Sequence, residues 1–262
     1  MKKVLSITIF LTLSLQSFSQ WKSFYSNREK KEESVKKEEK TEVNKQRFDN
    51  NYFNGIKAKA LENNEEAIKF FSKCLDLNSE SQSALYELSL LYQKEGDFNL
   101  ALEKINNAIA LDPENKWFIL TAAEINFSIQ DFKNAAKLYK RLVDLEPKKE
   151  EIYFQLADVY IYDEDYQRAI IVYDDLEKIN GPNKFLYIQK HKLYMQLKRE
   201  DKAIRELERA LRKYNDDIEL MQLLAEALLL NDQKKEAFIV FKKMSKISPD
   251  NGRLHLSLSE YY

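Results

Sequence analysis

Apolar residues recur along most of this chain at the three- and four-residue spacing of a helix that buries one face. One such stripe runs through Leu85, Leu88 and Tyr92, and a second begins at Ala101 after a short polar turn. Pro113 marks the end of the second stripe, because proline cannot continue a helix. The pattern therefore predicts two helices joined by a tight turn.

This helix pair recurs along the chain at a constant interval, which is typical of a solenoid. One column of the repeat is always alanine, at Ala67, Ala101, Ala135, Ala169, Ala203 and Ala237. A second column of small residues lies on the first helices, at Gly55, Ser89, Ala123, Ala157 and Ala225. Small side chains at a helix crossing let the larger neighbours interdigitate at interior packing density, so we interpret both columns as packing sites.

The pattern resembles the tetratricopeptide repeat over about residues 48–262. The resemblance implies an all-α, right-handed superhelical solenoid of tandem 34-residue helix-turn-helix repeats, in which the first helices line a concave groove. The predicted repeats cover about residues 48–81, 82–115, 116–149, 150–183, 184–217 and 218–251, with a partial seventh at 252–262. In the fifth repeat Lys190 and His191 take the apolar and small positions, which predicts looser packing or a shifted helix there.

The first residues have a different pattern. Two lysines precede a short apolar run and a small-residue site, so residues 1–19 are predicted to be a signal peptide cleaved between Ser19 and Gln20. An uncleaved anchor is the alternative, although the run is shorter than the ~20 residues of a spanning helix. The composition is similar to that of exported proteins of Bacteroidota-type bacteria. We therefore expect export to the periplasm, with secretion or the cell surface as the second possibility, and no membrane span after cleavage.

Residues 20–47 are predicted to be a flexible linker, because residues 27–47 are rich in charge and almost free of apolar side chains, so that burial cannot offset the entropy of ordering. The net charge of residues 21–47 is +3, whereas that of residues 48–262 is −6. A basic segment thus precedes an acidic array.

The resemblance implies that a partner binds to residues of the first helices that face the groove. Those residues are mostly apolar or aromatic, with carboxylates from the middle of the array onward, which favours a basic or amphipathic peptide or protein. The alternative for any single residue is packing against the next repeat. The candidate binding residues are Tyr52, Tyr86, Leu120, Phe154, Ile188, Leu90, Glu124, Asp158 and Phe127.

Residue types that carry catalysis are sparse. His191 and His255 are the only histidines, and neither has a cysteine or second histidine at ligand spacing. No glycine-rich loop is present to bind phosphate, and an acidic array does not match nucleic acid. We therefore expect no enzyme activity, no cofactor, no metal site and no nucleic-acid partner.

The sequence as a whole predicts a non-catalytic scaffold of the bacterial cell envelope that binds peptide segments or protein partners. One alternative is a sensory or assembly arm of a larger envelope or signalling protein. Another is a structural array that associates with itself through the C-terminal helix, where Leu254, Leu256, Leu258 and Tyr262 cluster.

Overall fold

The computed structural model describes residues 40–249, and these residues form helices and turns without a strand. They fall into two compact units, divided between Leu91 and Tyr92. The all-α fold of repeated helix pairs that the sequence predicts is therefore confirmed.

The first unit packs its helices around Phe71. It contains the helical residues 40–60, α2 (Asn64–Leu77) and most of α3 (Gln82–Glu95). Phe71 is completely buried, and a Cβ added to Gly55 would lie only 2.8 Å from its Cε1 atom. Any larger residue at position 55 would collide with this ring, which explains the small side chain there.

The only cysteine also lies in this unit. The Cys74 thiol is completely buried and donates a hydrogen bond to the carbonyl oxygen of Phe48, with an Sγ–O distance of 3.7 Å. Burial raises the pKa of Cys74 to about 11, and the charge of Asp49 adds to the shift. The thiol is therefore protonated at neutral pH, and Cys74 acts as a small core residue.

The helical part of the chain includes residues 40–47, which the sequence assigned to the flexible linker. Within this helix Phe48 stacks on Tyr52 with ring centroids 6.1 Å apart, and Tyr52 meets Phe71 of α2 edge-on at 5.4 Å. Once packed turns nucleate a helix, extending it by another residue costs little, and lysine, glutamate, glutamine and arginine are good helix formers. The linker prediction is therefore wrong for residues 40–47.

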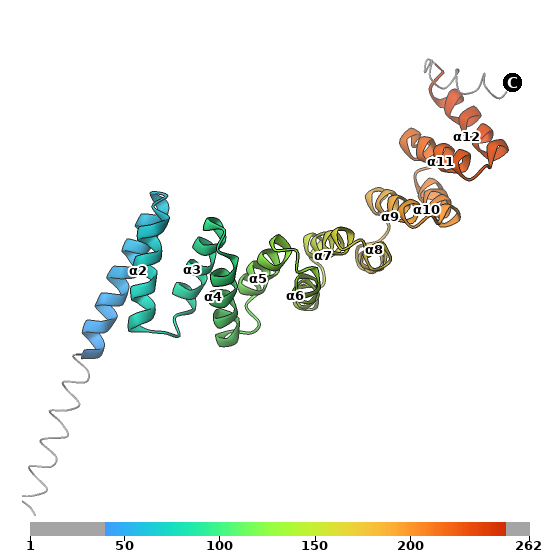
Figure 1. Ribbon diagram of the computed structural model, residues 1–262. Coiled ribbons are helices and arrows are strands. Elements are labelled where there is room, and N and C mark those ends of the chain that lie inside the picture. The colour runs from blue at the N-terminus through green and yellow to red at the C-terminus, as the bar shows by residue number, and fades with distance from the viewer. Residues whose placement is uncertain (1–39, 250–262) are drawn as a thin grey trace, which may run out of the picture. The chain divides into compact units, whose positions relative to one another are not determined.

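The second unit is a series of antiparallel helix pairs. Each helix packs against the next one in the chain, and α5, α7 and α9 follow one another with α6, α8 and α10 beside them (Figure 1). The first helices α5, α7, α9 and α11 begin at one and the same position of the 34-residue repeat, and the second helices share a starting position as well. The helices are α4 (Phe98–Leu111), α5 (Lys116–Ser128), α6 (Phe132–Leu145), α7 (Glu150–Tyr162), α8 (Tyr166–Asn180), α9 (Lys184–Gln196), α10 (Glu200–Lys213), α11 (Ile218–Leu230) and α12 (Lys234–Ile247).

The turn inside each pair repeats one backbone geometry. Its central residue has a positive φ, and the next backbone N–H closes the preceding helix by bonding a carbonyl five residues back, as Asp131 N does to Asn126 O at 2.8 Å. In most pairs that next residue is Asp or Asn, and its side chain caps the second helix. The residues with positive φ are Glu62, Gly96, Gln130, Glu164, Lys198 and Asp232.

The alanine column has the packing role that its spacing predicts. All six alanines are completely buried. The six large residues four positions later are buried as well, namely Phe71, Ile105, Tyr139, Tyr173, Leu207 and Phe241. In the second unit the core forms two clusters, one centred on α5–α8 and one on α9–α12. The interior of this unit thus consists of apolar clusters formed between successive helix pairs, rather than of a single central core.

Several predictions concern residues that the structure does not describe. They are the signal peptide with its cleavage site at Ser19 and Gln20, the linker as far as residue 39, and the partial seventh repeat with Leu254, Leu256, Leu258 and Tyr262. Within residues 40–249 no helix is long and apolar enough to cross a bilayer.

Candidate functional site

The candidate binding residues of the second unit lie on one side of α5, α7 and α9. Each of these helices buries the residue that precedes the candidate, namely Ile119, Tyr153 and Tyr187, whereas the candidates themselves are partly or fully exposed. We call this side the first-helix surface, and it consists of Trp117, Leu120, Glu124, Phe127, Phe154, Asp158, Phe185 and Ile188. The remaining candidates Tyr52, Tyr86 and Leu90 are half-buried in the first unit.

Two aromatic candidates also contribute to packing between neighbouring helix pairs. Phe127 of α5 meets Tyr162 of α7 edge-on with ring centroids 5.1 Å apart. Phe154 of α7 meets Phe185 of α9 in the same way at 5.4 Å. The alternative considered from the sequence, packing against the next repeat, therefore applies to both residues, although each keeps an exposed edge.

Glu124 and Asp158 are carboxylates at equivalent positions of α5 and α7. Burial raises the pKa of each above its ordinary value. Neither forms an ion pair with a basic side chain within the part of the chain that the structure describes. Asp158 is open to solvent at its surface, so its raised pKa reflects the protein atoms that crowd its flanks.

Buried tyrosines lie beside these carboxylates. Burial raises the pKa of Tyr139 of α6, and the charges of Glu124 and Asp158 raise it further. Burial likewise raises the pKa of Tyr173 of α8 to about 12, with a contribution from Asp158. The first-helix surface therefore carries two negative charges over an aromatic layer that offers no cation to balance them.

An open cavity of about 330 Å³ lies at the same side of α5 and α7. Leu120 and Ile152 supply apolar wall, Trp117 stands beside it with 66% of its surface exposed, and Lys116 bonds Glu146 at 2.8 Å on its border. Exposed tryptophans next to a recess are common anchors in protein interfaces.

The sequence interpretation did not single out Trp117 or Phe185. A signal was present, because both stand in a column of the 34-residue repeat that is otherwise polar: the other members are Asp49, Ser83, Glu151 and Glu219.

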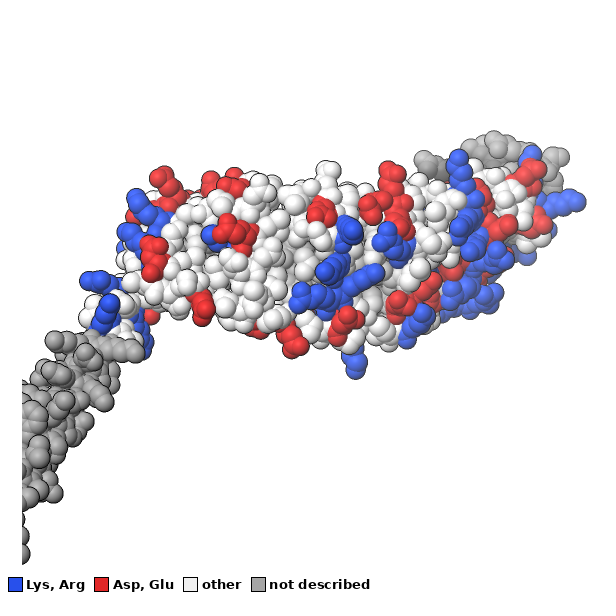
Figure 2. All heavy atoms as spheres, turned by 60° about the horizontal axis from the view of Figure 1, so that its bottom comes forward, with Lys and Arg blue, Asp and Glu red and all other residues white. Residues whose placement is uncertain are grey.

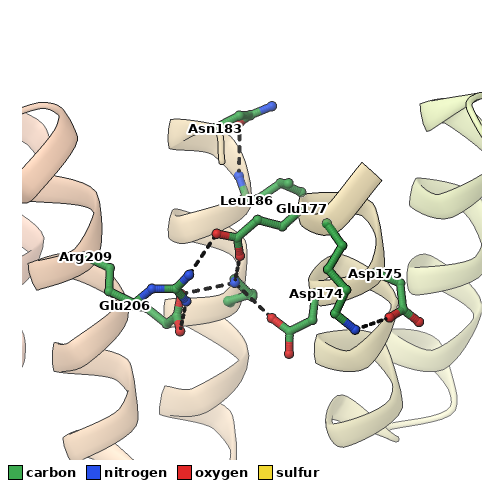
Figure 3. A network of polar contacts seen from close by, with 9 residues as sticks. Asp174, Asp175, Glu177, Asn183, Leu186, Glu206 and Arg209 are labelled. Atoms are coloured by element: carbon green, nitrogen blue, oxygen red, sulfur yellow. Dashed lines mark hydrogen bonds and ion pairs between the residues drawn. The ribbon is translucent and has the colours of Figure 1, made fainter. Parts of the chain in front are cut away.

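The fifth repeat was expected to pack less tightly or to have a shifted helix. Its first helix, α9, begins at the same repeat position as α5, α7 and α11, and Lys190 and His191 are both buried. Lys190 is completely buried, and its Nζ bonds Asp174 at 2.9 Å, Glu206 at 3.2 Å and, at shorter range, Glu177 (Figure 3). Arg209 joins Glu177 to Glu206, with N–O distances of 2.9 and 3.0 Å. The polar side chains thus replace an apolar contact with a hydrogen-bonded one, and Ala203 remains completely buried beneath them.

Opposing effects set the protonation of this network. Burial favours the neutral forms, but the bonds between Lys190 and its carboxylates outweigh it, so the pKa of Lys190 is raised. For the same reason the pKa of Glu177 is lowered, despite a burial effect of opposite sign. Lys190 and Glu177 are therefore both charged at neutral pH.

His191 lies next to this network in the column of small residues. It is 7% exposed, and its Nδ1 lies 3.3 Å from the carbonyl oxygen of Ala203. Burial lowers its pKa, outweighing the carbonyl contact, so the ring is neutral at physiological pH and Nδ1 donates to the oxygen. The larger ring fits because it bonds the backbone of the facing helix.

Among residues 40–249, no group of three or more histidine, cysteine, aspartate or glutamate side chains is arranged to hold a metal ion.

Comparisons with known proteins identify the repeat. Family models of the tetratricopeptide repeat match residues 58–81 and 82–115, and the family model described as anaphase-promoting complex, cyclosome, subunit 3 matches residues 128–210. No curated protein matches the chain. None of these family models describes an enzyme.

Solved structures share the fold at low sequence identity. A crystal structure of MamA protein is 21% identical with a TM-score of 0.54, covering 64% of this chain and 92% of that one. A second MamA crystal structure is 22% identical with a TM-score of 0.50, and the match covers 62% of this chain and 94% of that one. A structure of Naa15/Naa10 bound to HypK-THB is 18% identical with a TM-score of 0.61, and the match covers 78% of this chain but only 32% of that one.

The repeat matches, the helix pairs with 34-residue spacing and the buried alanine column agree with one another. Such an array is a scaffold for protein–protein interaction, and this chain belongs to the tetratricopeptide-repeat family.

Proposed function

We propose that the first-helix surface binds a basic or amphipathic peptide segment of a partner protein. The observation that carries this proposal is the pair Glu124 and Asp158, two partly desolvated carboxylates without a basic partner in the described residues. Keeping such groups ionised without a counter-charge costs free energy, and an incoming lysine or arginine removes that cost.

The apolar part of the surface supports the same kind of ligand. Trp117 and Phe185 remain about half exposed or more, and the cavity of about 330 Å³ beside Leu120 has room for an aliphatic or aromatic side chain. A segment with basic residues on one side and apolar residues on the other would contact both features.

We further propose that this scaffold acts in the bacterial envelope after export, most simply in the periplasm. The support is the predicted signal peptide of residues 1–19. Expression of the full chain in a Gram-negative host, followed by fractionation and intact mass measurement, tests this. A periplasmic product that begins at Gln20 agrees with the proposal, and an uncleaved cytoplasmic product contradicts it.

The binding proposal is tested with a synthetic amphipathic peptide containing lysines, and with an analogue whose lysines are glutamines. Asp158→Asn is expected to weaken binding of the lysine peptide by about 1 kcal/mol, roughly fivefold in Kd. The same substitution should leave the free energy of unfolding unchanged or raise it slightly, because folding no longer dehydrates a charge. If the substitution instead caused partial unfolding, both the affinity for the peptide and the free energy of unfolding would fall.

Trp117→Ala probes the apolar contribution and should cost about 1–2 kcal/mol of binding energy if the residue is an anchor. Ile239→Ala on α12 is the matched control, since Ile239 is 67% exposed and lies on a second helix away from this surface. Equal affinity of Trp117→Ala and Ile239→Ala, or equal affinity of the two peptides, would refute the assignment of the surface.

Affinity should also depend on pH. A bound cation favours the ionised carboxylates, so binding weakens as the pH falls through the raised pKa values of Glu124 and Asp158. This weakening should begin at a higher pH than for ordinary carboxylates, and it should be reduced in Asp158→Asn with Glu124→Gln.

A further inference from the structure

A second surface of the same unit gathers basic side chains around a cleft. The cleft has a volume of about 520 Å³ and lies beside α6, where α7 ends and α8 begins. Lysines and arginines form conspicuous groups on the face of the molecule that Figure 2 shows. The cleft is lined by the basic residues Lys133, Lys137, Lys140, Arg141 and Arg168, the carboxylates Asp144 and Asp163, and Phe132, Ala136 and Tyr160.

Tyr160 holds two of these cations in place. Its ring is buried, with the Arg168 guanidinium 4.7 Å and the Lys140 ammonium 5.7 Å from its centroid. Arg168 also bonds Asp165 at 2.6 Å, and Arg141 donates to the carbonyl oxygen of Pro113 at 2.6 Å. The arginines are therefore fixed by the protein at the border of the cleft.

The three lysines have no carboxylate partner in the described part of the chain. Lys133, Lys137 and Lys140 are exposed, and none forms an ion pair with a carboxylate within residues 40–249. They stand four and three residues apart on α6, so their charges repel one another along one face of the helix. This arrangement costs free energy in the unbound protein.

Packing of the repeat does not require these lysines. At the three equivalent positions, every other second helix in the described residues has at least one acidic or uncharged residue. The equivalent residues are Glu65, Lys69 and Ser72 in α2, Asn99, Glu103 and Asn106 in α4, Gln167, Ile171 and Asp174 in α8, Asp201, Arg205 and Glu208 in α10, and Lys235, Ile239 and Lys242 in α12.

We propose that this basic cleft binds a short acidic segment of a protein partner, separately from the first-helix surface. The cations from Lys133 to Arg141 extend about 12 Å along α6, which matches aspartates or glutamates at three- and four-residue spacing on a partner helix. Phe132 and Ala136 supply an apolar wall for a side chain between those carboxylates.

Charge complementarity favours a short acidic segment over an extended polyanion. Asp144 and Asp163 lie at the cleft itself, and the repeats carry a net charge of −6. A nucleic-acid duplex carries one negative charge per ~1.7 Å, so a duplex or an anionic membrane would meet repulsion beyond the ~12 Å of basic surface. A few clustered carboxylates can contact the lysines and arginines of the cleft without extending beyond this basic surface.

The test measures binding of a short fluorescent helical peptide with glutamates at three- and four-residue spacing, at low and moderate salt. Lys133→Gln, Lys137→Gln and Lys140→Gln are combined in one variant of the full chain. The matched control combines Lys235→Gln, Lys242→Gln and Lys246→Gln on α12, which removes the same charge from another helix with little change in helix propensity. We expect the cleft variant to lose affinity about tenfold and the control to lose less than about twofold.

Three outcomes would overturn the proposal. One is that the glutamine analogue of the peptide binds as well as the glutamate peptide. Another is that the control variant loses as much affinity as the cleft variant. The third is that a DNA duplex, or a vesicle containing phosphatidylglycerol, binds more tightly than the peptide through the same three lysines, which would assign the cleft to phosphate. Circular dichroism of both variants verifies that the fold is intact, and unchanged binding of the lysine peptide at the first-helix surface separates this proposal from the preceding one.

Discussion

The helix pairs α7–α8 and α9–α10 begin at equivalent positions of the repeat, but they fill equivalent core positions with different side-chain chemistry. In the first pair Leu156 and Ala157 face the core, and both are buried within an apolar cluster. In the second pair the equivalent residues are Lys190 and His191, and both are buried as well. The repeat therefore fixes where a side chain goes, but it does not require that side chain to be apolar.

The difference extends to the residues that surround these positions. Glu177 and Glu206, which bond Lys190, stand where Val143 and Val172 pack near Leu156. Three apolar positions have thus changed together into an ion-paired group. Buried ion pairs add little net stability compared with apolar packing, but losing one member leaves the others uncompensated.

Lys190→Met should have the largest effect. It leaves three carboxylates around a site without its ammonium group, so we expect a loss of about 3–5 kcal/mol in the free energy of unfolding. Leu156→Met, the matched change in the apolar pair, should cost less than about 1.5 kcal/mol. Urea unfolding followed by circular dichroism compares the two variants.

A combined variant sharpens this comparison. Lys190→Leu with Glu177→Val and Glu206→Val rebuilds the apolar layer of the preceding pair, and its stability should equal that of the original protein or exceed it by up to about 4 kcal/mol. If the combined variant were as unstable as Lys190→Met, the uncompensated charge would not be the reason for the loss.

The second prediction concerns pH and His191. Because burial lowers the pKa of this histidine in the folded state, the unfolded chain binds a proton more readily, and stability falls as the pH drops below the ordinary histidine pKa of about 6.5. The nearby charge of Lys192 acts in the same direction, and that of Glu226 opposes it. Thermal unfolding between about pH 8 and pH 5 should therefore show a decrease in Tm.

His191→Gln provides the comparison, because glutamine cannot titrate. The variant starts from a lower stability, having lost the fit of the ring, but its Tm should decline less over this pH range. Glu177, whose pKa is lowered, loses its contribution only at more acidic pH and so does not produce the same effect. Parallel pH profiles for the two proteins would show that His191 is not the source.

The sequence predicted the features that depend on local packing and chain geometry. The constant repeat interval, the alanine column and the polar turns each follow from how two helices cross, so their positions matched the structure closely. Lys190 was correctly placed on a core position, but its burial within an ion-paired group was not predicted. Its partners lie on the neighbouring helices α8 and α10, and only the packed structure shows that their charged atoms meet.

The candidate site shows the same limit. That Leu120, Phe154 and Asp158 share a side of the first helices follows from periodicity alone. Periodicity does not tell which of them also pack against the next helix pair, as Phe154 does, nor whether a carboxylate has a cation nearby. Both depend on how far side chains reach between neighbouring helices.

The smallest expected effect comes from a helix cap. Asp165 begins α8 by accepting a hydrogen bond from the backbone N–H of Arg168 at 2.9 Å, whereas Arg199, at the equivalent position before α10, makes no such bond. Arg199→Asn should therefore stabilise the protein by about 0.5–1 kcal/mol, and Asp165→Ala should destabilise it by about 1 kcal/mol, both measured as changes in Tm. The bond from Arg199 to Gln167 is exposed, so its loss should cost little. Should Asp165→Ala cost stability while Arg199→Asn gains none, the start of α10 would be held by contacts other than its cap, and the two pairs would then differ in their turns as well as in their cores.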